Sequence, residues 1–183
     1  DRTGNIWIGT YNGGINIYKP GKVWFEFFAP NLMDSEELRH RSILSILQSQ
    51  NGKIWIGSDG GGLNWISQEN SRFYTPPYKH DPENDRSLAG NIVKTIFEDS
   101  RNRLWVGLFG GGLDLFDPDT ETFRHVLEGS ASVWSIAERK NGRLWVATMG
   151  DGIVVLDAGG KYVETLGHDP ADPGGLASVH IMA

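Results

Sequence analysis

The sequence predicts an all-β protein, a β-propeller of four-stranded antiparallel blades, and three observations lead to this prediction. One phrase occurs four times in the 183 residues, as GNIWIGTYNGGIN, GKIWIGSDGGGLN, NRLWVGLFGGGLD and GRLWVATMGDGIV. The 24 glycines argue against a helical repeat, because each glycine inside a helix costs about 1 kcal/mol. Each repeated tryptophan stands in an apolar triplet such as Ile54-Trp55-Ile56, so both faces of its strand need burial. Stacked blades cover both faces, whereas a two-layer sandwich covers only one.

The repeat keeps a fixed register along the chain. A glycine follows each tryptophan by seven positions, and an apolar residue comes directly after that glycine. These structural positions are Trp7, Trp55, Trp105 and Trp145, with Gly14, Gly62, Gly112 and Gly152. We expect the tryptophan on a strand buried on both faces and the glycine in the turn that follows it.

Four strand candidates follow one another in each unit, most clearly NIVKTIFED, NRLWVGL, GGLDLFD and ETFRHV in the third. Within one propeller region, 1–183, we expect about four blade-equivalents. They are an incomplete blade of strands two to four over 1–28, blades over 42–75, 91–127 and 131–166, and the first strand of a further or closing blade over 176–183. Such a chain is a fragment of a larger propeller, or a ring closed by pairing of its complementary termini within one chain or between two.

Two kinds of turn separate these strands. Asn51-Gly52 and Asn141-Gly142 favour type I′ hairpin turns between the first and second strands, which need positive φ at both central residues. The glycine runs after the tryptophan strands also occur in phosphate-binding loops, but those loops lead into a helix. Here each run leads into a strand such as LDLFD, which favours a tight turn.

Composition excludes several classes of function. A net charge of −6, from 17 basic and 23 acidic residues, provides no electrostatic footprint for nucleic acid or for an anionic membrane surface. The sequence has no apolar run long enough to span a bilayer. It has no cysteine, which excludes disulfides, thiolate metal sites and cysteine nucleophiles but fits any compartment. With neither an initiator methionine nor a targeting segment, the chain is expected to be cut from a longer protein.

The connections between blades provide a second signature. YKHDPENDRSLAGNIV and LGHDPADPGGLASVHI share His-Asp-Pro, with a leucine eight positions after the histidine. Together with D-x-x-G/N-x-[IL]-W-[IV]-G, the following GGL and D-x-x-T-x-x-F, this signature makes essentially the whole chain resemble the two-component regulator propeller repeat. The recurring Trp-Asp and Gly-His signatures of the WD-repeat family are absent.

The resemblance implies an extracytoplasmic or periplasmic sensor region. Propellers of this family occur in histidine kinases, hybrid two-component regulators and diguanylate cyclases, and several members look like sensors of carbohydrate breakdown products. It therefore implies a ligand-sensing or scaffolding module that is not itself an enzyme, with the signalling output elsewhere. The fourth unit departs from the family pattern at Ala147 and Asp151, and the first two units lack the His-Asp-Pro connection between them. These departures argue against a uniform ligand site.

Candidate catalytic and metal-binding groups are few, and we expect neither a catalytic residue nor a cofactor. The five histidines lack the close, recurring spacing of metal ligands, so no metal site is expected. His80 and His168 recur in the blade connections and indicate turn structure. FDPDTETF lacks the central glycine and distal glutamate of a calcium loop. No serine has the spacing of a nucleophile elbow, although paired carboxylates from distant blades stay open.

The candidate ligand site lies on loops that break the repeat. In a propeller, the turn between the second and third strands shares one rim with the link into the next blade, and non-repeating loop residues there carry specificity. The candidate residues are Tyr11, Asn12, Arg39, His40, Arg41, Asp59, Asn91, Phe109, Ser132, Trp134, Met149 and Asp151. Trp24, Trp65 and Trp134 do not recur between units, so they either stack against sugar rings or fill gaps between blades.

Three functions follow from this sequence. The first is a sensor module that responds to an oligosaccharide without turning it over. The second is a protein-binding or dimerisation scaffold that self-associates through its terminal strands. The third and least favoured is a propeller enzyme that cleaves glycans with a rim carboxylate such as Asp59 or Asp151.

Overall fold

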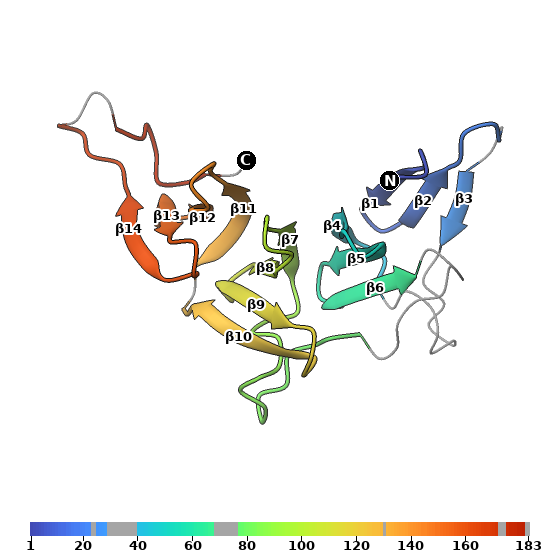
Figure 1. Ribbon diagram of the computed structural model, residues 1–183, viewed down its shortest axis with the longest axis horizontal. Helices are drawn as coiled ribbons and strands as arrows, with labels where there is room; N and C mark the ends of the chain where they lie inside the picture. Colours follow the sequence, from blue (N-terminus) through green and yellow to red (C-terminus); the bar gives the residue numbers. More distant parts are fainter. Residues whose placement is uncertain (23–24, 29–39, 68–76, 130, 172–174, 182–183) are drawn as a thin grey trace.

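The computed structural model describes residues 1–22, 25–28, 40–67, 77–129, 131–171 and 175–181. Its strands form four antiparallel sheets, and within each sheet the strands pair in chain order. The sheets follow one another as blades along an open arc (Figure 1). The all-β class and the propeller blades are therefore as predicted. No helix in the described ranges is long and apolar enough to cross a membrane.

Blades 1 and 2 each have three described strands. Blade 1 holds β1 (Ile6–Thr10), β2 (Gly14–Tyr18) and β3 (Phe25–Phe28), and blade 2 holds β4 (Ile43–Gln48), β5 (Lys53–Ser58) and β6 (Leu63–Ser67). The fourth strand expected for blade 2, over 72–75, lies outside the described residues.

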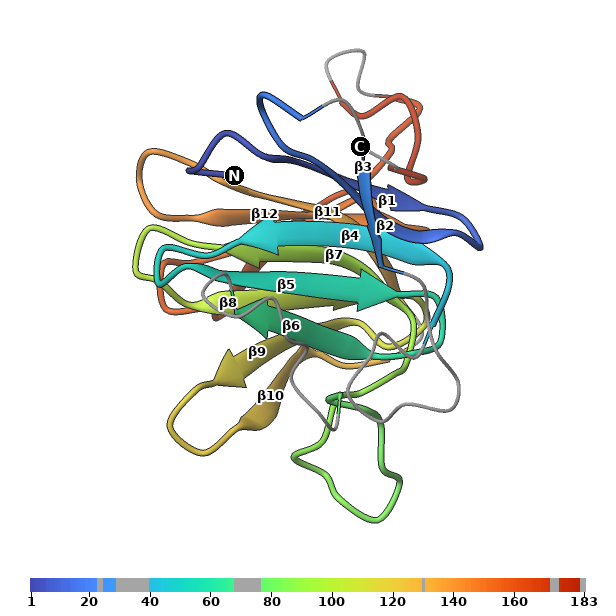
Figure 2. The same ribbon diagram turned by 90° about the vertical axis from the view of Figure 1, so that its right-hand side faces the viewer.

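Blades 3 and 4 have four strands each. Blade 3 holds β7 (Val93–Glu98), β8 (Leu104–Leu108), β9 (Leu113–Asp117) and β10 (Thr122–Leu127), and blade 4 holds β11 (Ser132–Glu138), β12 (Leu144–Met149), β13 (Ile153–Leu156) and β14 (Tyr162–Leu166). The innermost strands lie together on the inside of the arc, where β7 contacts both β4 and β11. Figure 2 shows strands of blades 2 and 3 running across the view, so their turns gather at two opposite ends.

An apolar core lies between each pair of neighbouring blades. The tryptophan side of a blade faces the next blade, and its isoleucine or valine side faces the blade before it. Trp55 of blade 2 packs with Leu104 and Val106 of blade 3. Trp105 of blade 3 packs with Val146 of blade 4 in the same way. Both faces of the tryptophan strands are thus buried in the interior blades, as the apolar triplets predict.

Blade 1 shows what a covering blade contributes. Ile6 and Ile8 of β1 are 56% and 40% exposed, whereas the matching Ile54 and Ile56 of β5 are 1% and 0% exposed. Blade 1 covers this face of blade 2, and no described blade covers the corresponding face of β1. Burial at these two positions therefore depends on the neighbouring blade rather than on the residue type.

A glycine two positions after the tryptophan sets how closely the blades approach. A Cβ at Gly57 would lie 2.5 Å from Cγ1 of Val93 in β7, and a Cβ at Gly107 would lie 2.7 Å from Cγ1 of Val133 in β11. In the fourth unit Ala147 takes this position and is 8% exposed. The W-[IV]-G phrase therefore provides both the aromatic face and the space for the next innermost strand.

The turns between first and second strands correct one prediction. A type I′ turn needs positive φ at Asn51 as well as at Gly52, but of the two only Gly52 has it, at 86°. Gly52 N donates to Ser49 O at 3.0 Å, which makes a three-residue loop with a bulge at the glycine. This conformation lets Asn51 Oδ1 accept the Ser49 hydroxyl at 2.5 Å. The same correction applies to Asn141-Gly142, where only Gly142 has positive φ, at 76°.

The repeated glycine seven positions after the tryptophan is a turn residue. Its φ is 74°, 77°, 73° and 80° in the four units, at Gly14, Gly62, Gly112 and Gly152. A Cβ at Gly112 would overlap the carbonyl oxygen of Leu127, and one at Gly152 would overlap that of Leu166. Each of these glycines leads into a strand, as expected for turns and unlike a phosphate-binding loop.

The segment 175–181 takes the place of the first strand of a further blade. Gly152 N donates to Val179 O at 3.0 Å, and Ile181 N donates to Thr148 O at 3.0 Å. Instead of a full strand, the described part of 176–183 forms one bridge, between Met149 and His180. A ring closed within one chain is not formed by the described residues: β1 pairs with β2 alone, and β1 and the segment 175–181 lie on separate arms of the arc (Figure 1).

Candidate ligand site at the blade rim

One edge of the arc is built by a contact that recurs in all four units. The turn after each tryptophan strand lies beside the start of the next innermost strand, and we call this edge the rim. It comprises turns 10–14, 58–62, 108–112 and 148–152 with strand starts 41–42, 91–92, 131–132 and 179–180. The turn glycine donates its N–H to Arg41 O at 2.8 Å, Asn91 O at 2.9 Å, Ala131 O at 3.0 Å and Val179 O at 3.0 Å in turn. The structure therefore brings together the turns and links that sequence reasoning placed on one rim.

The rim position four residues after the tryptophan is exposed in three of the four units and varies in chemistry. Tyr11 is 77% exposed, Phe109 is 48% exposed and Met149 is 44% exposed. Asp59 takes the same position in blade 2 and is partly buried. These apolar side chains fill no core, so the interfaces between blades do not explain their presence.

Several candidate residues serve the rim backbone. Asn91 accepts Gly60 N and Gly62 N at its carbonyl, and its Oδ1 accepts His80 N at 2.9 Å. Ser132 is 7% exposed, and its Oγ accepts Gly110 N at 3.0 Å. The structure gives Asn91 and Ser132 a positioning role.

Of the other candidates, some are exposed to solvent and one forms a side-chain hydrogen bond. Asn12 has φ 63°, and its Oδ1 accepts the Ser42 hydroxyl at 3.0 Å. Arg41 and Asp151 are exposed, and His40 is partly buried. Arg39 lies outside the described residues.

A second group of non-repeating side chains lies next to the rim, near the starts of three innermost strands. β4, β7 and β11 each have a register shift at the same point, between Ile43 and Ser45 in β4, for example. The residues at these bulges are Leu44, Lys94 and Trp134. A bulge bends its strand and re-aims a side chain, and bulges are frequent beside functional sites. Sequence reasoning singled out Trp134 but missed Leu44 and Lys94.

Lys94 and Trp134 contact each other across the joint between blades 3 and 4. Lys94 Nζ lies 4.0 Å from the ring centroid of Trp134. The Nε1 atom of Trp134 is buried and donates no hydrogen bond within the described part of the chain. Trp65 differs, because it pairs with Trp55 in blade 2 at 6.4 Å between ring centroids and belongs to the interface with blade 3. Trp24 lies outside the described residues.

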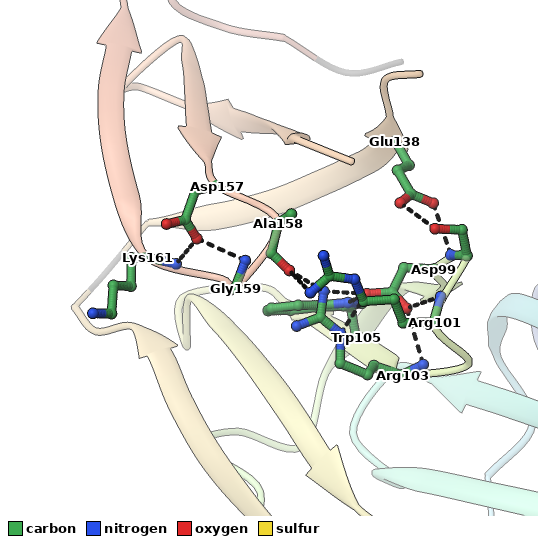
Figure 3. A network of polar contacts seen from close by, with 10 residues as sticks. Asp99, Arg101, Arg103, Trp105, Glu138, Asp157, Ala158, Gly159 and Lys161 are labelled. Carbon is green, nitrogen blue, oxygen red and sulfur yellow. Dashed lines mark hydrogen bonds and ion pairs between the residues drawn. The ribbon is translucent and has the colours of Figure 1, made fainter. Parts of the chain in front are cut away.

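The edge opposite the rim carries a polar joint between blades. Asp99 Oδ2 accepts Trp105 Nε1 at 2.8 Å, and Arg103 reaches the Ala158 carbonyl of blade 4 at 2.9 Å (Figure 3). Burial raises the pKa of Asp99, but hydrogen bonds from Trp105 and Arg103 outweigh it and hold this pKa below its usual value. The aspartate six positions before a tryptophan is therefore structural.

A recurring acceptor seven positions before the tryptophan joins blades at this opposite edge. Gln48, Glu98 and Glu138 each accept a backbone N–H from the turn of the preceding blade, at 2.8 Å, 2.7 Å and 2.7 Å. Figure 3 shows this contact at Glu138. Sequence reasoning missed it, although the recurring Gln or Glu at one offset was the available signal.

Blade 3 holds a pair of a buried aspartate and a partly buried histidine that no other described blade repeats. Asp114 is fully buried, its Oδ1 lies 2.6 Å from His125 Nδ1, and its Oδ2 accepts Ala89 N at 2.8 Å. Burial raises the pKa of Asp114 despite these partners. Burial lowers the pKa of His125, but the hydrogen bond and charge of Asp114 outweigh it, so this pKa is raised. The pair therefore ties the connection before β7 to the blade, and His125 also lines an open cleft of about 640 Å³ with Arg86.

The histidines of the blade connections are turn residues, as expected. His80 Nδ1 lies 2.9 Å from Leu88 O, and His168 Nδ1 lies 2.6 Å from Leu176 O. Both therefore close the same eight-residue turn. Within the described ranges no three histidine, aspartate or glutamate side chains converge as metal ligands.

Comparison with known proteins gives a family match in three of the four units. The family model of the two component regulator propeller matches residues 37–60, 87–110 and 127–150, and each match runs from the innermost strand, or shortly before it, to the rim turn of one blade. The comparison with curated proteins gave no match.

Solved structures share the fold at low sequence identity. The extracellular domain of a putative one component system from B. thetaiotaomicron is 22% identical with a TM-score of 0.80, covering 98% of this chain and 23% of that one. The extracellular domain of a putative hybrid two component system from B. thetaiotaomicron is 23% identical with a TM-score of 0.54, covering 96% of this chain and 28% of that one. A catalytically inactive virginiamycin B lyase from Staphylococcus aureus, solved with quinupristin, is 18% identical with a TM-score of 0.64, covering 93% of this chain and 54% of that one.

These likenesses concern the fold, and the chain spans about a quarter of the length of the two extracellular domains. The three matched segments contain Trp55, Trp105 and Trp145 and, in each case, the strand that pairs with the tryptophan strand. Three units of this chain, in blades 2, 3 and 4, match the two-component regulator propeller repeat.

Proposed function

We propose that the chain is a non-catalytic sensor module in the extracytoplasmic part of a two-component signalling protein, and that its rim binds an oligosaccharide. The family match supports the signalling context, because a matched segment lies in three of the four blades. The likeness to two extracellular domains of bacterial signalling systems supports the compartment. The likeness to a lyase concerns the fold alone and adds no argument for catalysis.

The observation that carries the ligand proposal is the chemistry of the rim. Tyr11, Phe109 and Met149 are exposed apolar side chains at one repeated position, next to the bulges that hold Lys94 and Trp134. Sugar rings bind through their apolar C–H faces to such side chains, while polar neighbours satisfy the hydroxyls. A rim that differs at every blade suits a chain of unlike sugar units better than a single symmetric ligand.

A thermal-shift screen of the chain against plant, bacterial and host oligosaccharides tests the proposal. We expect at least one sugar to raise the Tm, because a ligand bound only by the folded state stabilises it. The same sugar should leave the Tm of Phe109→Ser and Tyr11→Ser variants less changed, and no sugar should be cleaved during the incubation. If no sugar raises the Tm or gives a binding signal in calorimetry, the proposal is overturned. If a sugar is cleaved and products are released, the enzyme function replaces it.

A scaffold function is the second candidate, and the exposed face of blade 1 favours it. Ile6 and Ile8 are exposed at positions that are buried in all the other blades. A blade with a tryptophan face, from another copy of the chain, fits this surface in the way that blade 1 fits blade 2. Light scattering of the chain and of an Ile8→Lys variant tests this second candidate. Self-association that the Ile8→Lys substitution abolishes would support the scaffold function, whereas a wild-type chain that is strictly monomeric would exclude self-association.

A further inference from the structure

The rim contacts of blades 2 and 3 place three residues side by side in one row. Ile92, just before β7, forms an antiparallel bridge with Asp59 of the blade 2 turn on one side. On its other side, Phe109 N donates to Ile92 O at 3.0 Å. Segments paired in this way lie about 4.8 Å apart, so the backbones of Asp59 and Phe109 are separated by roughly 10 Å along the row.

The same row continues into blade 4. Gly110 N, in the turn that carries Phe109, donates to Ser132 Oγ at 3.0 Å. Ser132 is in turn the cross-strand partner of Met149, and Met149 forms an antiparallel bridge with His180. Phe109 and Met149 are therefore also two strand spacings apart, which is roughly 10 Å. In Figure 2 this row lies at the end of the molecule to which the arrow of β5 points.

The residue four positions after the tryptophan comes at every second step of this row. Phe109 and Met149 are exposed at these steps, and Asp59 provides a carboxylate at the step of blade 2. The steps between them are the starts of innermost strands, where Ser132 is buried. Within blades 2 to 4 the rim therefore presents one accessible side chain for every two strand spacings, and the backbone pairing of the repeat sets this period.

An extended glycan has a matching period. In a β-1,4-linked chain with two-fold symmetry, each unit is turned over relative to the one before it, so every second unit presents the same apolar C–H face. Two units of such a chain have nearly the length of the interval between neighbouring rim positions. The chain therefore places equivalent ring faces on successive exposed side chains. A coiled chain, such as an α-1,4-linked glucan, does not keep this period.

We propose that the rim selects extended, two-fold oligosaccharides, with the first and third of three successive units resting on Phe109 and Met149 and a hydroxyl of a further unit bound by Asp59. This inference rests on the proposed function and adds the backbone geometry of the ligand. The residue type at each step determines which sugar unit fits there, whereas the period of the row determines which linkage fits. Glycans made of the same sugar but with different linkages therefore separate the two contributions.

Calorimetry of the full chain with cellohexaose, mannohexaose and maltohexaose tests the inference. Cellohexaose and mannohexaose are extended, whereas maltohexaose contains the same glucose units as cellohexaose in a coiled chain. We expect at least one extended hexaose to bind, and to bind at least about tenfold more tightly than maltohexaose, because only an extended chain makes both apolar contacts. The disaccharide of the same series reaches one rim position at a time, so it should bind roughly tenfold more weakly than its hexaose.

Two variants test whether both positions bind one chain. Phe109→Ser and Met149→Ser should each weaken hexaose binding by about tenfold. Each should change disaccharide binding by no more than about twofold, because the other position still binds the disaccharide. Tyr162→Ser is the matched control: Tyr162 is 61% exposed on β14, outside the row, so this variant should keep the wild-type affinity for the hexaose.

Several results would overturn the inference. Maltohexaose that binds as tightly as the extended hexaoses would do so, and so would equal affinities for a hexaose and its disaccharide. A hexaose affinity that neither Phe109→Ser nor Met149→Ser changes would also contradict it. If neither extended hexaose binds while another oligosaccharide of the thermal-shift screen does, the inference fails and the proposed function stands. If no sugar binds at all, both fail.

Discussion

The interfaces between blades and the rim use the same repeat in opposite ways. At the interfaces between blades 2 and 3 and between blades 3 and 4, residue type is kept and the tryptophan is buried, as for Trp55 at 3% and Trp105 at 0% exposure. At the rim, the backbone contacts are kept but the side chains change from blade to blade, from Tyr11 to Asp59 to Phe109. The repeat therefore fixes the position of each rim side chain, whereas the residue type at that position differs from blade to blade.

The largest effect should come from removing an interface tryptophan. Trp105→Ala should lower the free energy of unfolding by about 3–5 kcal/mol, because it empties the core between blades 3 and 4 and removes one hydrogen-bond donor to Asp99. Trp145→Ala should cost only about 1–2 kcal/mol, because Trp145 is partly buried and no described sheet follows blade 4. Urea unfolding of both variants measures the difference, and equal losses would contradict the role assigned to the covering blade.

Two glycines of the turn 108–112 allow the effect of a steric clash to be separated from the effect of a positive φ. Gly112→Ala should cost about 3 kcal/mol or more, because the residue has φ 73° and a Cβ would overlap Leu127 O. Gly110→Ala should cost about 1 kcal/mol, because its φ of 69° is strained for alanine but the space is open. Thermal melting of the two variants gives the comparison. Equal Tm values would mean that the close approach of β10 is unimportant.

The pair of Asp114 and His125 makes the stability of blade 3 depend on pH. The folded-state pKa of His125 is raised above 6.5, so its contribution is complete below pH 6.5 and is lost as the pH rises through the raised value. The pKa of Asp114 is raised above 3.8, so stability also falls with rising pH in that lower window. His125→Gln should flatten the decline above pH 6.5. Urea midpoints from pH 5.5 to 8.5 test this, with Phe109→Ser as a control that keeps the wild-type decline.

Much of the fold could be predicted because the repeat is local and periodic. Trp105, Gly112 and the strand that follows them lie close together in the sequence, so one phrase specifies strand, turn and burial. The bulges at Leu44, Lys94 and Trp134 could not be predicted, because a bulge depends on how two strands pair. The type I′ turn at Asn51-Gly52 was wrong because the Asn51 side chain bonds Ser49 and favours another turn.

The candidate site was predictable in place but not in content. The rim geometry followed from the propeller, so Tyr11, Phe109 and Met149 were placed beside the strand starts. The side chains of Asn91 and Ser132 accept the backbone N–H groups of His80 and Gly110, so they position the backbone near the rim. Lys94 was missed because a single lysine on a strand has no signal in the sequence until the Trp134 ring is placed beside it.

The smallest effect on stability should come from the rim itself. Phe109→Ser should change the free energy of unfolding by no more than about 0.5 kcal/mol, because the side chain is 48% exposed and fills no core. Met149→Ser should behave in the same way. A loss above about 2 kcal/mol in urea unfolding would show that these side chains belong to the fold and would weaken the case for a rim site.

The central claim is that the repeated interface residues stabilise the fold, whereas the rim side chains bind the ligand. One measurement tests this claim most directly. It is the Tm of the wild-type chain and of a Tyr11→Ser, Phe109→Ser, Met149→Ser triple variant, each with and without the oligosaccharide found by the screen. The account predicts nearly equal Tm values without the sugar, and a rise on adding the sugar that occurs in the wild type and is lost in the variant. A variant that melts well below the wild type, or that keeps the full rise, would contradict it.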